Sequence, residues 1–135
     1  MRDSKDAFHL AIPAHNLEDA EEFYVRLLGC KLARRYDDRI TLDFFGDQLV
    51  CHLSEPSSGT VETLDLYPRH FGVTFRDEPD FEAVHRLCVQ RKIPMCCEMT
   101  HRFEGMAEVH RTFVLQDPSS NLIEFKHYTD ARMMY

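Results

Sequence analysis

Residues 8–29 read FHLAIPAHNLEDAEEFYVRLLG, and this stretch contains both elements that open the fold. The segment Phe8–Ala14 is apolar and carries Pro13 near its end, which favours a strand over a helix. Asn16 is a good N-cap, and the apolar residues after it recur at helical spacing until Gly29. The stretch therefore predicts a strand followed by an amphipathic helix.

Three further strands are expected after this helix, separated by short turns. The same order of elements then recurs, because an apolar strand is followed by a helix that begins near a proline and by three more strands. In the first half the expected strands are Lys31–Asp37, Arg39–Phe45 and Gln48–Ser54. In the second half we expect a strand at His70–Phe75, a helix from Pro79 to Arg91, and strands at Met95–Phe103, Val109–Gln116 and Leu122–Tyr128.

This repeated order indicates an internal duplication. The best local match aligns HLAI, which begins at His9, with HFGV, which begins at His70. We expect one domain over residues 1–135, with modules at 8–54 and 70–128. The Pro-, Ser- and Gly-containing segment 55–69 is expected to be the linker, and a segment of this length in a compact domain is usually functional or mobile.

Each module places one candidate ligand at the start of its first strand and another within its last strand. These are His9 and His70, then His52 and Glu124. Strand alternation puts each first-strand histidine on a face with small residues, which leaves room for a ligand. A glutamate inside an apolar strand needs a metal or an ion pair, and Lys126 and Arg111 are candidate partners. Two imidazoles and one carboxylate form the facial set that non-haem iron(II) uses.

Four motifs that include these residues resemble the vicinal oxygen chelate superfamily, which contains glyoxalase I, extradiol dioxygenases and the fosfomycin and bleomycin resistance proteins. They read FHLAIP, LEDAEEFYVRLLGCKL, HFGVTF and LQDPSSNLIEFK. The resemblance implies an α+β fold in which two βαβββ modules pair into a cupped, incomplete mixed β-barrel around a metal. Carried onto this chain, the family's ligands are His9, His70 and Glu124.

The resemblance leaves the reaction open. Three protein ligands leave three octahedral positions, which suits an extradiol-type iron(II) dioxygenase, the activity that we favour. His52 lies on the strand where glyoxalases have a fourth ligand, usually glutamate, so it could coordinate or act as an acid–base group. Four ligands would suit a glyoxalase-like lyase or isomerase, or a thiol transferase. The non-enzyme alternative is a metal-free drug-sequestering protein. Manganese, nickel and zinc also suit these ligands.

The segment His101–His110 is rich in charged residues and could cover a pocket, with Arg102 placed on an anionic substrate. We assign His15, His85 and His127 to the surface. The net charge of −7 argues against a nucleic-acid partner, and no apolar run reaches the length of a membrane helix. Five cysteines that match no zinc motif predict free thiols in the cytoplasm. The resemblance also leads us to expect a homodimer that acts on a small molecule.

Overall fold

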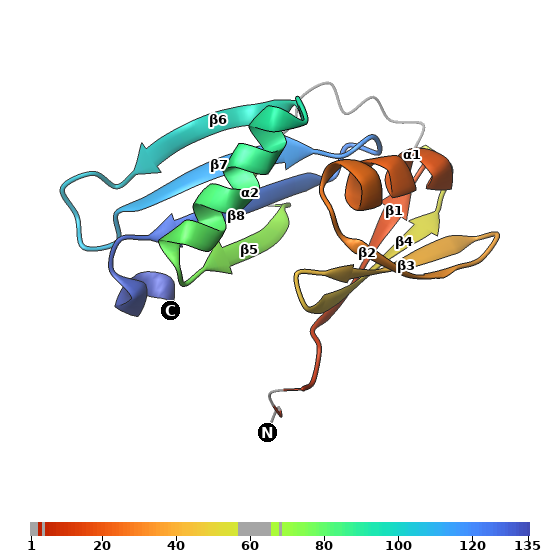
Figure 1. Ribbon diagram of the computed structural model, residues 1–135, viewed down its shortest axis with the longest axis horizontal. Coiled ribbons are helices and arrows are strands. Elements are labelled where there is room, and N and C mark those ends of the chain that lie inside the picture. The colour runs from red at the N-terminus through yellow and green to blue at the C-terminus, as the bar shows by residue number, and fades with distance from the viewer. Residues whose placement is uncertain (1–2, 4, 57–65, 68) are drawn as a thin grey trace. The chain divides into compact units, whose positions relative to one another are not determined.

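The computed structural model describes residues 3, 5–56, 66–67 and 69–135, and the chain divides into two compact units. The units are Met1–Glu62 and Thr63–Tyr135. Each unit is a βαβββ module with one four-stranded mixed sheet (Figure 1). The predicted α+β class and the duplication are therefore confirmed. Most of the predicted linker, residues 57–65 and 68, lies outside the described residues.

The first unit follows the predicted order closely. Its strands lie in the order β1-β4-β3-β2, with β1 parallel to β4 and the remaining neighbours antiparallel. The elements are β1 (His9–Ala14), α1 (Leu17–Glu21), a π-helical segment η1 (Glu22–Leu27), β2 (Lys31–Arg35), β3 (Arg39–Phe44) and β4 (Asp47–Leu53).

The second unit repeats this topology in the order β5-β8-β7-β6, with β5 parallel to β8. Its helix lies along one face of its sheet (Figure 1). The elements are β5 (Phe71–Phe75), α2 (Glu78–Gln90), β6 (Met95–Arg102), β7 (His110–Gln116) and β8 (Leu122–Tyr128). A short 3₁₀-helix, η2 (Ala131–Met134), follows β8.

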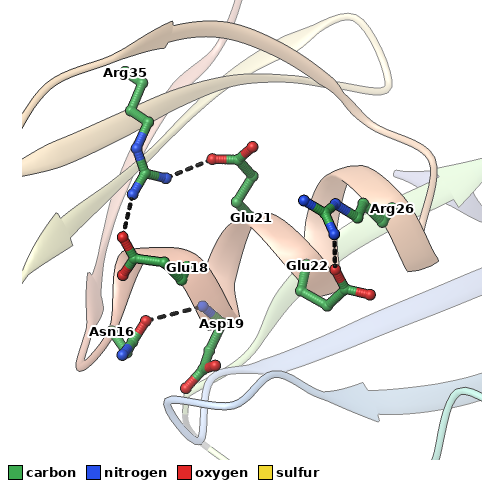
Figure 2. A network of polar contacts seen from close by, with 7 residues as sticks. All are labelled: Asn16, Glu18, Asp19, Glu21, Glu22, Arg26 and Arg35. Carbon is green, nitrogen blue, oxygen red and sulfur yellow. Dashed lines mark hydrogen bonds and ion pairs between the residues drawn. The ribbon is translucent and has the colours of Figure 1, made fainter.

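Polar contacts fix the start of α1 and hold it to the edge of its sheet (Figure 2). The Asn16 side chain accepts a hydrogen bond from the backbone N–H of Asp19 at 3.0 Å, as the N-cap prediction requires. Arg35 of β2 forms ion pairs with Glu18 at 2.7 Å and with Glu21 at 2.5 Å. Its guanidinium therefore bridges two successive turns of the helix to the strand.

The predicted regular helix changes its hydrogen-bonding pattern after Glu21. The backbone N–H of Leu28 donates to the carbonyl of Phe23, five residues earlier, at 2.8 Å. Phe23 and Tyr24 are buried in this π-helical segment, and Gly29 ends it with φ at +88°. The wider turn keeps both aromatic rings in the core, whereas the apolar spacing alone had indicated an ordinary α-helix.

Each sheet buries one face under its helix. In the first unit α1 contacts β3 and β4, whose fully buried residues include Ile40, Leu42 and Leu49. In the second unit α2 contacts β5 and β8, and Phe81 packs on Phe113 with ring centroids 5.5 Å apart. The alternate residues of each sheet lie on the other face, which we call the open face. The predicted ligands His9, His52 and Glu124 alternate with these core residues and so belong to the open faces, whereas His70, which was expected to open its strand, directly precedes β5.

The assignment of two histidines to the surface was wrong. His85 is half-buried, and its ring lies against Phe113 at 5.1 Å. His127 is half-buried too, with Nδ1 3.2 Å from the carbonyl oxygen of Phe75. Both therefore belong to the packing between α2 and its sheet, whereas His15 is exposed as expected. No helix among the described residues is long and apolar enough to cross a membrane.

Candidate metal centre

The second unit gathers four polar side chains on the open face of its sheet, and Glu124 of β8 is at their centre. Its side chain is 7% exposed, and its Oε2 lies 3.3 Å from Nε2 of His70 and 3.1 Å from Nζ of Lys126. Its other oxygen, Oε1, accepts a hydrogen bond from the hydroxyl of Thr112 at 2.8 Å. Both carboxylate oxygens are therefore engaged although the side chain is almost fully buried.

These contacts keep the carboxylate ionised. Burial is the largest influence on the pKa of Glu124 and acts to raise it. The hydrogen bonds from Thr112 and Lys126, together with the nearby charge of Lys126, outweigh burial and leave the pKa of Glu124 below its ordinary value of 4.5. An ionised carboxylate is the form that binds a metal, so Glu124 is held in the state that can act as a ligand.

The two first-strand histidines are oriented in the same way. Nδ1 of His70 lies 2.7 Å from the carbonyl oxygen of Leu66, and Nδ1 of His9 lies 2.6 Å from Oε1 of Gln48. An oxygen acceptor at Nδ1 requires the proton there, so the neutral ring keeps its lone pair on Nε2. This second contact is the usual means of fixing the tautomer of a metal-binding imidazole.

The strand register decides which residues of the two units are equivalent. In the second unit Gly72 of β5 pairs with Glu124 of β8. In the first unit the matching residue of β1, Ala11, pairs with Val50 of β4. The residue equivalent to Glu124 is therefore Val50, and His52 lies two positions further along its strand. His52 and Glu124 lie on equivalent strands, as expected, but at different register positions, because His52 matches Lys126.

The small residue beside His70 does not leave a pocket. A Cβ added to Gly72 would lie 1.6 Å from the backbone oxygen of Glu124. Glycine is needed at this position because β5 and β8 approach one another too closely to leave room for a side chain. The expectation of free space above small residues is thus incorrect at Gly72, where the space is filled by the backbone that carries the carboxylate.

Arg102 is brought to the same cluster through a residue that the sequence did not single out. Its guanidinium lies 3.5 Å from the hydroxyl of Tyr67, and the Tyr67 ring meets the His70 ring edge to face at 5.6 Å. Tyr67 is 56% exposed, so the pair is accessible to solvent. Arg102 is therefore one residue removed from the proposed ligand His70.

Sequence reasoning named the ion-pair alternatives Lys126 and Arg111 for Glu124, and the structure separates them. Lys126 does pair with Glu124, whereas Arg111 lies on the helix side of the sheet and binds Glu78 and Glu82 of α2 at 2.8 and 2.5 Å. Thr112 was missed. Strand alternation places Thr112 on the same face as Val114, but only the pairing of Val114 with Glu124 brings it beside the carboxylate, so the sequence carried no signal for this contact.

His52 is exposed near the end of β4, on the open face of the first unit together with His9. Within the described residues there is no group of three or more His, Cys, Asp or Glu side chains already gathered to hold an ion. The second unit brings together two donors of the predicted set, His70 and Glu124, whereas His9 belongs to the other unit. His70 and Glu124 suit a divalent metal, because the imidazole presents its Nε2 lone pair and the carboxylate is ionised.

Comparisons with known proteins agree with this fold. The sequence model of the Glyoxalase/Bleomycin resistance protein/Dioxygenase superfamily matches residues 7–125. A solved protein of that description from Alicyclobacillus acidocaldarius is 60% identical, with a TM-score of 0.92 and complete coverage of both chains. No curated protein matches the sequence significantly.

Two more distant structures are similar in fold. The lactoylglutathione lyase of Agrobacterium tumefaciens is 16% identical, with a TM-score of 0.67 over 90% of this chain and 92% of the lyase. The fosfomycin resistance protein FosX of Listeria monocytogenes is 12% identical, with a TM-score of 0.68 over 96% of this chain and 98% of that protein. The fold of this chain is therefore shared by two proteins whose names state different activities.

Proposed function

This chain belongs to the Glyoxalase/Bleomycin resistance protein/Dioxygenase superfamily, and from that premise we propose that it is a metal-dependent enzyme. Its divalent ion would be held by His9, His70 and Glu124, with iron(II) favoured and manganese, nickel or zinc as alternatives. The activity that suits this ligand set best is an extradiol-type dioxygenation of a small substrate that chelates through neighbouring oxygens. The three ligands come from one chain, or from two if the modules are exchanged in a homodimer.

One observation carries the proposal. His70 Nε2 and Glu124 Oε2 lie 3.3 Å apart, and each group is held from its far side by a contact that leaves these two atoms directed at one another. A protein that needed only an ion pair would already have one in Glu124 and Lys126. The tautomer that Leu66 imposes on His70 is the one that binds a metal, and Gln48 imposes the same tautomer on His9.

The register supports three protein ligands over four. Val50 occupies the position equivalent to Glu124, and valine has no donor atom. A glyoxalase-like set with a fourth ligand at this point would require a carboxylate there. When bound, the metal would supply a Lewis acid to neighbouring oxygens of the substrate and a place for dioxygen to bind.

Three further residues would support the metal centre or act on the substrate. Thr112 holds Glu124 in one orientation, which limits the reorganisation needed for metal binding. Arg102, presented beside His70 by Tyr67, is positioned to pair with a negative group of the substrate. His52 lies on the open face of its own sheet, where an imidazole can accept or donate a proton near neutral pH. We propose both residues as catalytic groups.

The wider setting remains a proposal as well. One domain over residues 1–135 with modules 8–54 and 70–128, a homodimer, and a cytoplasmic location are the arrangement that we favour. The five described cysteines form no disulfide, as expected for a reducing compartment.

Anaerobic reconstitution tests the proposal. The protein would be loaded separately with iron(II), manganese, nickel and zinc, and the bound metal would be counted by mass spectrometry after removal of free ions. We expect about one metal per chain in the wild type and almost none in His70→Ala and Glu124→Ala. His52→Ala is the matched control, because it removes an imidazole outside the proposed ligand set and should keep its metal.

The loaded protein would then be assayed against catechols, a glutathione hemithioacetal and fosfomycin. Dioxygen uptake with a catechol supports the dioxygenase. Turnover of only the hemithioacetal or only fosfomycin would show that the protein is a lyase or a thiol transferase and not a dioxygenase. Absence of metal in the wild type would instead favour a drug-sequestering protein and end the enzyme proposal.

A further inference from the structure

Lys126 is the one residue of the Glu124 cluster that the proposed metal centre does not use. Its Nζ lies 3.1 Å from Oε2 of Glu124, the same oxygen that faces Nε2 of His70. The lysine side chain is 28% exposed, so part of it is accessible to solvent at the open face. On either side of it in the sheet are Thr74 and Thr112, which are uncharged.

A metal ion and this ammonium group would compete for one oxygen atom. A divalent cation held by Glu124 and His70 would place a second positive charge close to the oxygen that Lys126 now contacts, and it would repel the ammonium group. The long lysine side chain can turn away while it stays on the same face of the sheet. Metal loading would thus exchange an ion pair inside the protein for an unpaired ammonium beside the metal.

The charges of the loaded centre then select the substrate. The ammonium of Lys126 cancels the charge of the Glu124 carboxylate, and neutral imidazoles add nothing, so the full charge of the divalent ion is left uncompensated. Arg102 is a further cation near His70, through Tyr67. A partly buried site with this surplus of positive charge attracts and orients anions.

We propose that the substrate is a small anion that chelates the metal through two oxygens and carries a further negative group for Lys126. Lys126 is thus a specificity-determining residue, freed for this role by metal binding. This inference rests on the proposed metal centre. It goes beyond that proposal because it gives Lys126, which is not a metal ligand, a role in specificity and because it states that the substrate is an anion.

The inference makes two opposite predictions for Lys126→Met. Manganese should bind more tightly, by about threefold or more, because a competing cation has been removed. Oxalate should bind the manganese-loaded protein more weakly, by about tenfold, because oxalate keeps negative charge outside its chelate ring. If the lysine had only a structural role, Lys126→Met would weaken manganese binding and oxalate binding alike.

Isothermal titration calorimetry with manganese alone, and then with oxalate or acetohydroxamate, provides the test. Acetohydroxamate chelates through two oxygens but has no charged group beyond them, so its affinity should change by less than about twofold in Lys126→Met. Lys126→Arg should keep most of the oxalate affinity. Lys31→Met removes the same charge from β2 of the first unit and should behave like the wild type.

Tighter manganese with selectively weaker oxalate supports the inference. Equal weakening of both chelators, or unchanged oxalate binding in Lys126→Met, overturns it while the metal centre stands. A wild-type protein that takes up no metal overturns the proposed function, and the inference falls with it.

Discussion

Gly72→Ala should lower the free energy of unfolding by about 3 kcal/mol, although it adds one methyl group at an exposed position of a strand. The new Cβ would lie 1.6 Å from the backbone oxygen of Glu124, where ordinary contact begins near 3.4 Å. β5 and β8 would therefore have to separate by about 1.8 Å at this pair. Such a shift breaks backbone hydrogen bonds, whose normal donor–acceptor distance is about 2.9 Å.

The magnitude follows from those bonds. Losing two or three hydrogen bonds costs about 2–4 kcal/mol, and the reduced freedom of the unfolded chain offsets this by less than about 1 kcal/mol. Urea unfolding followed by circular dichroism measures the change. With an m-value of about 2 kcal/mol/M, the midpoint should fall by about 1.5 M.

The control is Ala11→Gly at the equivalent register position of the first unit, where the chain already carries a Cβ. This change should cost only about 0.5–1 kcal/mol through backbone entropy. Because Gly72 lies against the backbone of Glu124, Gly72→Ala should also weaken metal binding. An unchanged midpoint in Gly72→Ala would show that the strands do not approach as closely as described, and would refute the reasoning.

Three further outcomes are expected. Thr112→Val should destabilise the protein by about 1.5–3 kcal/mol, because it leaves one oxygen of a buried carboxylate unpaired, whereas Thr112→Ser should restore most of the loss; equal urea midpoints for the two variants would contradict this. Since the pKa of folded Glu124 lies below 4.5, its ionisation stabilises the protein above that pH and the gain is lost as the pH falls through the folded pKa. Urea midpoints between pH 6 and pH 3.5 should therefore fall less steeply in Glu124→Gln than in the wild type, and parallel slopes would exclude this contribution. Burial raises the pKa of the Cys30 thiol to about 12 and that of Cys88 to about 11, so iodoacetamide at pH 8 should label the exposed Cys96 and Cys97 before either of them; peptide mass spectrometry would reveal early labelling of Cys30 or Cys88 if this is wrong.

Local signals in the sequence were sufficient for the elements and their order. Alternation, the Asn16 cap and Gly29 each act within a few residues, so the strand–helix–strand pattern of both modules could be predicted. The open face of each strand could be predicted for the same reason. His70 and Glu124 were thus assigned to one face before their 3.3 Å approach was known. The convergence of His9 with them stays a prediction.

Register was decided only by the tertiary structure. Alternation with a period of two says which face a residue occupies but not which residue lies beside it on the next strand. That choice depends on backbone pairing between residues far apart in the sequence, Ala11 with Val50 and Gly72 with Glu124, and it makes Val50 the equivalent of Glu124. The role of Gly72 has the same origin, because a small residue can leave space or allow a close approach, and only the neighbouring strand decides between them.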